Sequence, residues 1–128
     1  MSIKEPLMDD LTKWVDKEIK QLEGSALRLV LLAIIERHQA TGIYGYNIGE
    51  ELFSYTEGEL DGSKATFYAI LRRLEKDGLV KSELQVSPGT GPARKYYRLT
   101  SKGKRAYNAL WQNWIYYYGI LDRLIENK

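Results

Sequence analysis

The stretch that decides the fold runs from Ser63 to Thr100 and reads SKATFYAILRRLEKDGLVKSELQVSPGTGPARKYYRLT. Its first part predicts a helix, because four apolar residues recur at i, i+3, i+4 and i+7: Phe67, Ile70, Leu71 and Leu74. Ser63 is suited to cap the start of this helix, since its hydroxyl can accept from the first unpaired amides. Asp77-Gly78 is expected to end it.

The remainder of the stretch predicts a β-hairpin. Leu79–Val86 and Arg94–Thr100 are rich in strand-forming residues, and a proline- and glycine-rich linker at 87–92 joins them. On the second strand, Tyr97 and Leu99 share the face that we expect to turn inward, and Arg94 lies on the other face. A helix followed by a hairpin with basic residues near its tip predicts a winged helix-turn-helix.

Positive charge is concentrated in this part of the chain. Residues 63–105 carry a net charge of +8, whereas the remainder carries −6, so the whole-chain value of +2 conceals the difference. A basic surface of this kind binds a polyanion by releasing the counterions of its phosphates, although a solvated protein face can have the same composition. The candidate contacts to double-stranded DNA are Lys64, Thr66, Tyr68, Arg72, Arg73, Lys76, Arg94 and Lys95. For Tyr68 the alternative is packing against the preceding helix.

The segments before this stretch predict more helix. Leu11, Val15, Ile19 and Leu22 recur at helical spacing, which predicts an amphipathic helix over Pro6–Leu22 that Gly24 breaks. Ser25–His38 is apolar on nearly every side and is expected to form the central helix of the domain. A further short helix is expected to follow Tyr44-Gly45-Tyr46 and to end near Tyr55.

The C-terminal segment predicts a long helix that assembles with a second chain. From Tyr107 onward, apolar residues step by three and four, which is the spacing of a two-stranded helical seam. This band is too broad for one small domain to cover, so we expect a homodimer in which the N-terminal helix of the other chain contributes. The predicted interface consists of Leu11, Trp14, Val15, Tyr107, Leu110, Trp114, Leu121 and Leu124.

These patterns define one fold class and three segments. We expect a mainly α protein with a small β-hairpin: an amphipathic helix at 1–23, a winged helix-turn-helix at 24–100 and a dimerisation helix at 101–128. A chain of 128 residues is long enough for one domain of this kind. The longest nearly apolar run, Leu29–Ile35, is too short to span a bilayer, and the N-terminus lacks the pattern of a signal peptide. A cytoplasmic location without membrane contact is therefore expected.

The sequence offers little for catalysis. It contains no cysteine and a single histidine, His38, which is expected to be a capping or surface residue. Neither a phosphate-binding glycine loop nor metal-ligand spacing occurs, so the predicted sets of catalytic residues, metal ligands and cofactors are all empty. Two function classes remain: a DNA-binding regulator, and a winged-helix module that binds protein instead of operator DNA. Salt-dependent binding to a duplex distinguishes them.

Three sequence blocks resemble the signature of PadR-type transcriptional regulators. They are Tyr44-Gly45-Tyr46-x-Ile48, the run from Ala65 to Val80, and the run from Gly91 through Leu99-Thr100 to Gly103. The chain departs from the pattern at residues 65–69, which read Ala-Thr-Phe-Tyr-Ala where many members read Gly-Thr-Leu-Tyr-Pro. The resemblance implies a dimeric winged-helix protein, usually a repressor, that binds a pseudo-palindromic operator. The single C-terminal helix is similar to the short, multidrug-sensing subgroup.

The same resemblance implies an effector site. In members of that subgroup, a tryptophan of the C-terminal helix from each subunit flanks a flat aromatic ligand at the dimer interface, and Trp114 is the matching position. The candidate ligand-binding residues are Trp111, Trp114, Tyr117 and Tyr118. Aromatic residues at this spacing can equally form a packed interface without a ligand, and the sequence leaves both alternatives open.

Overall fold

A computed structural model describes residues 9–58, 64–86 and 91–126 of the chain. Four helices and three short strands follow one another along it. They are α1 (Asp9–Arg37), β1 (Ile43–Tyr44), α2 (Gly45–Tyr55), α3 (Lys64–Lys76), β2 (Val80–Gln85), β3 (Arg94–Leu99) and α4 (Ser101–Glu126). The predicted fold class is confirmed, including the hairpin of β2 and β3 and the long helix at the C-terminus.

The sheet is antiparallel, with β3 in the middle and β1 and β2 at the edges. The sequence pattern missed β1, because a strand of two residues is too short to show a periodicity and exists here only through its pairing with β3. In that pairing Ile43 lies opposite Tyr97, and Tyr44 lies opposite Tyr96. The turn before the strand requires the glycine at position 42, whose φ of 78° is unfavourable for other residues.

One hydrophobic core joins the C-terminal half of α1, α2, α3 and the inner face of the sheet. Leu31, Ile48, Leu71 and Leu99 are each at most 1% exposed and represent the four parts. The predicted core residues of α3 lie in this cluster: Phe67, Leu71 and Leu74 are buried, and Ile70 is packed against them. On β3, Tyr97 and Leu99 point inward as predicted.

The predicted break at Gly24 is wrong, because α1 continues without interruption from Asp9 to Arg37. A glycine inside a helix costs only about 1 kcal/mol relative to alanine, and no proline follows to remove a backbone donor. The hydrogen bonds of the flanking turns therefore suffice to carry the helix through. The predicted amphipathic helix and the predicted central helix of the domain are therefore one continuous helix, α1.

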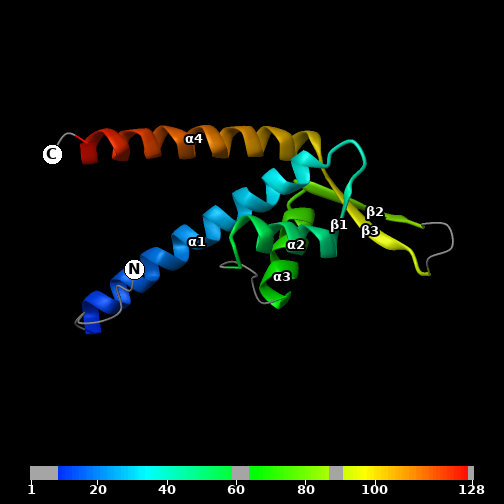
Figure 1. Ribbon diagram of the computed structural model, residues 1–128, viewed down its shortest axis with the longest axis horizontal. Helices are drawn as coiled ribbons and strands as arrows, with labels where there is room; N and C mark the ends of the chain where they lie inside the picture. The colour runs from blue at the N-terminus through cyan, green and yellow to red at the C-terminus, as the bar shows by residue number, and fades with distance from the viewer. Residues whose placement is uncertain (1–8, 59–63, 87–90, 127–128) are drawn as a thin grey trace.

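The two long helices leave the rest of the molecule in the same general direction. Figure 1 shows α1 and α4 extending away from the β2–β3 hairpin, close together near the sheet and separated at their far ends. Figure 1 shows α2 and α3 on the side of α1 that is turned away from α4, with β2 and β3 extending to the right and β3 leading into α4. Within the described residues, no helix combines the length and the apolar character that a membrane crossing requires.

Candidate nucleic-acid interface

The exposed face of α3 is polar and basic. Its buried stripe leaves the opposite side to solvent, and the exposed residues are Thr66, Ala69, Arg72, Arg73 and Lys76. Arg73 lies 3.4 Å from the carboxylate of Asp77, one turn further along, and both side chains are largely exposed. Such a pair contributes little to stability and leaves Arg73 able to exchange partners. The structure thus places four of the predicted DNA-contacting residues, Thr66, Arg72, Arg73 and Lys76, on one accessible face.

Tyr68, another candidate DNA contact of this helix, is only partly accessible. It is half-buried, its ring centroid is 4.9 Å from that of Phe67, and it packs against the core. It lies at the margin of the buried stripe of α3, next to Gly45 at the start of α2. A Cβ built on Gly45 would lie 3.7 Å from Cε1 of Tyr68, which is an ordinary van der Waals distance. Part of Tyr68 nevertheless remains accessible beside Arg72.

Two hydrogen-bonded contacts fix the hairpin against the helices. Ser82 of β2 donates to the Glu75 carboxylate of α3 at 2.7 Å. Arg98 of β3 donates from Nε to the Gln39 carbonyl at 3.1 Å, and it also pairs with Glu83 across the hairpin. The hydrogen bond from Arg98 lowers the pKa of Glu83. Arg98 is therefore a structural residue, although nothing in its local sequence distinguishes it from the other basic residues.

Gln39 adds a third connection, which the sequence analysis also missed. Its side-chain amide donates to the carbonyl of Leu99 and accepts from the Leu99 N–H, both at 2.9 Å. This reciprocal pair satisfies the backbone of β3 where β1 no longer accompanies it. The end of α1 is thereby joined to the last residue of the strand that leads into α4.

The two predicted wing cations lie on opposite faces of β3. Arg94 is on the outer face, and its guanidinium carbon lies 4.9 Å from the centroid of the Tyr44 ring. Lys95 is exposed on the face that carries Tyr97. Burial raises the pKa of the Tyr97 hydroxyl, with smaller effects from Glu75 and Tyr68, while Arg72 opposes them.

The start of α4 explains the Leu-Thr-x-x-Gly block. The Thr100 hydroxyl accepts from the N–H of Gly103 at 3.0 Å, which caps the helix, and donates to the carbonyl of Gly78 at 2.6 Å. Gly103 is buried, and a Cβ at this position would lie 1.9 Å from the carbonyl oxygen of Leu79. Only glycine allows α4 to approach the backbone of Leu79, between α3 and β2, so closely.

The predicted interface residues of the long helices are largely solvent-accessible in the single chain. Leu11 and Trp14 on α1 are exposed, as are Leu110, Trp114, Leu121 and Leu124 on α4, while Val15 and Tyr107 are half-buried. Of the candidate ligand-binding residues, Tyr117 and Tyr118 are exposed, and half-buried Trp111 donates to Asn108 at 3.3 Å. Both long helices therefore carry apolar side chains without full cover from their own chain.

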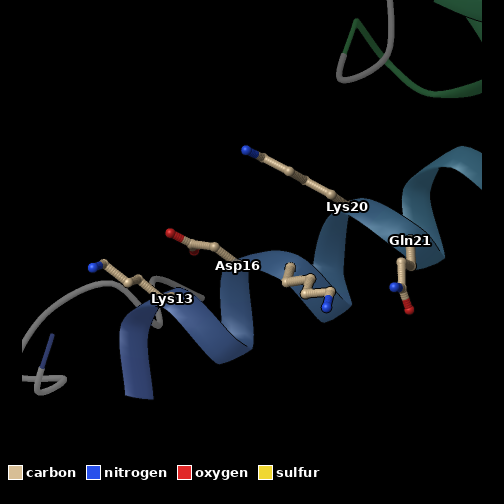
Figure 2. Close-up of a pocket in the computed structure, with 5 residues that line it drawn as sticks. Lys13, Asp16, Lys20 and Gln21 are labelled. Atoms are coloured by element: carbon tan, nitrogen blue, oxygen red, sulfur yellow. The ribbon is translucent and has the colours of Figure 1, made fainter. Parts of the chain in front are cut away.

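Two other features of the surface do not belong to this interface. A shallow hollow on α1 is lined by Lys13, Asp16, Lys17, Lys20 and Gln21, and Figure 2 shows these side chains extending from a single helix. His38 is half-buried rather than merely a surface residue, and its Nε2 lies 2.5 Å from a Glu51 oxygen, which ties the end of α1 to α2. Among the residues that the structure describes, no three histidine, aspartate or glutamate side chains are grouped as a metal site would require.

Three sequence predictions fall outside the described residues. They concern the cap at Ser63, the tip of the wing at 87–90 and the N-terminal residues 1–8. The backbone of Lys64 belongs to α3, but its side chain is likewise not described. The interface described above therefore rests on the exposed face of α3 from Thr66 onward and on the strands of the hairpin.

A recognition helix with a polar, basic face beside a hairpin defines a winged-helix DNA-binding protein. The sequence profile of the PadR-like family of transcriptional regulators matches residues 31–109, and the chain belongs to this family. Its members are transcriptional regulators rather than enzymes, and the chain is accordingly a DNA-binding regulator.

Known structures and sequences agree with this assignment. A PadR-like transcriptional regulator from Bacillus cereus is 27% identical and superposes with a TM-score of 0.71, covering 84% of this chain and 99% of the other. A Streptococcus transcriptional regulator is 28% identical with a TM-score of 0.68, covering 81% and 96%. An uncharacterized protein of Lysinibacillus sphaericus is 31% identical over 105 residues, which are 82% of this chain and 92% of that protein.

Proposed function

We propose that the chain is a homodimeric, sequence-specific regulator that represses transcription by binding a pseudo-palindromic operator. The observation that carries this proposal is the exposed face of α3, where Thr66, Ala69 and Arg72 lie opposite the apolar stripe that packs into the core. The N-terminal half of such a helix suits base edges in the major groove, and arginine suits guanine or phosphate. Arg73, Lys76, Lys64 and a cation of the wing supply further contacts to the backbone.

Dimerisation follows from the uncovered apolar side chains of the long helices. Trp114 is 49% exposed and Leu121 is 56% exposed, although both lie on the predicted seam of α4. A second copy that covers this seam with its own α1 and α4 removes the apolar surface from water. Two recognition helices in such a dimer address half-sites about one helical turn, ~34 Å, apart.

Release from DNA is assigned to the same interface. A planar aromatic effector between the two copies of Trp114 gains stacking energy, and rotation of the subunits at the seam changes the separation of the recognition helices. Trp111, Tyr117 and Tyr118 add aromatic surface around that position. The location of the protein in the cytoplasm, where its DNA lies, is part of this proposal.

Arg72→Ala tests the role of α3. We expect specific binding to weaken by about 1–3 kcal/mol, because the variant loses one contact to a base or phosphate. The dimer should remain intact, since Arg72 is exposed on α3, away from the long helices. The measurements are duplex titrations at several salt concentrations and sedimentation equilibrium, with Arg123→Ala on α4 as the control for an equal loss of charge. Loss of dimerisation in Arg72→Ala contradicts this division of roles.

Trp114→Ala tests the interface and the effector site together. We expect a weaker dimer, a reduced response to planar cationic dyes, or both, because the side chain supplies exposed aromatic surface on α4. Intrinsic tryptophan fluorescence during dye titration measures the response, and sedimentation measures association. Trp14→Ala on α1 serves as the comparison, because it removes an exposed tryptophan outside the proposed ligand cluster. An unchanged dye response together with unchanged association rejects both roles of Trp114.

A further inference from the structure

The hairpin of β2 and β3 has two chemically different faces. Its outer face carries Arg94, Tyr96 and Arg98, and these side chains are engaged with Tyr44, Glu83 and the end of α1. On the inner face, the residue pairs from the core outward are Val80 with Leu99, Ser82 with Tyr97, and Leu84 with Lys95. The two predicted wing cations, Arg94 and Lys95, therefore point in opposite directions.

The inner face is covered near the core and uncovered toward the tip. Leu99 is 1% exposed and Tyr97 is 6% exposed, whereas Leu84 is 68% exposed. Lys95, opposite Leu84, is also exposed. Val86, which follows directly after β2, is 69% exposed. The result is a small apolar strip with a cation beside it, on the same face of the sheet that packs against the recognition helix.

This strip continues directly from α3. Glu75 of α3 accepts a hydrogen bond from Ser82, and Leu84 lies two residues further along β2, about 7 Å away at the spacing of a strand. Arg72 lies near enough to Tyr97 to act on its pKa. The exposed face of α3 and the strip are therefore neighbours, and a ligand that follows the face of α3 meets Leu84 and Lys95 next.

We propose that Leu84 and Lys95 form the surface through which the wing contacts duplex DNA, and that Arg94 does not contribute to it. Leu84 packs against deoxyribose, and Lys95 neutralises an adjacent phosphate. Arg94 instead fixes the hairpin by its contact with the Tyr44 ring on the opposite face. This inference rests on the proposed function, and it selects one face of the wing as the continuation of the DNA interface.

The test compares matched variants of the full-length protein in duplex titrations over a range of salt concentrations. For Lys95→Gln we expect the slope of log K against log[salt] to fall by about 0.9, the value for one lost phosphate contact, and for Arg94→Gln an unchanged slope. For Leu84→Thr, which keeps a strand-forming residue, we expect affinity to weaken about fivefold at unchanged slope, because apolar contact is lost without loss of charge. Equal melting temperatures confirm that all variants are folded.

The opposite pattern overturns the proposal: a reduced slope for Arg94→Gln together with an unchanged slope for Lys95→Gln. It is also overturned when Leu84→Thr leaves DNA affinity unchanged but alters sedimentation, because the strip then contacts another protein chain. Arg72→Gln, measured in the same series, separates this inference from the proposed function. When Arg72→Gln weakens binding and the strip variants do not, only the strip assignment fails; when the wild-type protein binds no duplex with salt dependence, the function itself fails.

Discussion

Similar apolar residues are buried in the winged-helix unit but exposed on the parts of α1 and α4 that extend beyond it. Leu71 in α3 is fully buried, whereas Leu121 in α4 is 56% exposed, although each belongs to the apolar stripe of its helix. In the winged-helix unit, α1, α2, α3 and the sheet bury each other's apolar faces. Beyond the sheet, α1 and α4 diverge and leave such faces open (Figure 1).

This difference distinguishes stabilisation by contacts within one chain from stabilisation by contacts with a second chain. The winged-helix unit obtains its stability from contacts within one chain, so its geometry does not depend on a partner. The far halves of α1 and α4 expose apolar side chains that a second chain covers in the proposed dimer, so in that proposal their arrangement responds to protein concentration and to a ligand. The proposed function needs both properties, because it combines a fixed DNA-binding unit with an adjustable spacing between two such units.

The largest expected effect is at the junction of the two regions. Gly103→Ala places a Cβ 1.9 Å from the Leu79 carbonyl oxygen, so α4 must move away from the segment that joins α3 to β2. We expect the free energy of unfolding to fall by about 3 kcal/mol or more, the upper part of the range for overpacked sites. Chemical denaturation measures this change.

Gly119→Ala is the matched control in the same helix. A Cβ there lies 3.6 Å from its nearest neighbour, the flexible end of Arg123, so the substitution should be tolerated and can raise helix stability by up to about 1 kcal/mol. Equal stabilities for the two variants would falsify the claim that the close approach of α4 to Leu79 requires glycine.

A second prediction compares the same substitution in both regions. Leu71→Ala should lower the free energy of unfolding by about 2–5 kcal/mol, because it opens a cavity in the core. Leu121→Ala should leave the packing of the winged-helix unit intact and instead weaken association of the dimer, by about 1 kcal/mol for a residue at a typical interface contact. Denaturation and sedimentation equilibrium over a range of protein concentrations measure the two effects.

Either of two results would contradict the proposed difference between the winged-helix unit and the long helices. Leu121→Ala could leave association unchanged, which places the seam elsewhere. Alternatively, the wild-type protein could sediment as a monomer, which removes the need for a second surface. Leu71→Ala distinguishes these results from general instability, because its effect arises inside one chain whether or not the protein dimerises.

The sequence was sufficient where a structural element is defined by its own periodicity. The buried stripe of α3, the alternation of Tyr97 and Leu99 in β3, and the length of α4 each follow from side-chain spacing within one segment. The boundary that Gly24 predicts is absent, because the cooperative hydrogen bonding of the turns on both sides outweighs the local effect of a single glycine.

The features that the sequence missed depend on contacts between distant segments. β1 exists only beside β3, and Tyr68 is half-buried because its ring packs against the core that several segments form together. Gln39 and Arg98 are linked to each other across more than fifty residues, and no spacing rule predicts such a pair. Gly103 was recognised as part of a motif, but its close approach to Leu79 became evident only from the structure.

The smallest predicted effect concerns the ion pair between Glu83 and Arg98 on the exposed side of the hairpin. The hydrogen bond from Arg98 lowers the pKa of Glu83, so the folded state favours its carboxylate over the protonated form. This contribution to stability is present above the ordinary pKa of glutamate and is lost as the pH falls through the lowered value. Because Glu83 is exposed, solvent and salt screen the pair and keep the contribution small.

Glu83→Gln should therefore be slightly less stable than the wild type at neutral pH, and the two proteins should become equal below the lowered pKa of Glu83. Chemical denaturation across the acidic range measures the difference, with Glu126→Gln at the end of α4 as a control for removal of the same charge. A stability difference that grows as the pH falls has the wrong sign for this mechanism. A difference that stays constant with pH shows that the amide introduced by Glu83→Gln replaces the carboxylate poorly for reasons other than charge. Arg98 then holds the hairpin mainly through its hydrogen bond to the Gln39 carbonyl.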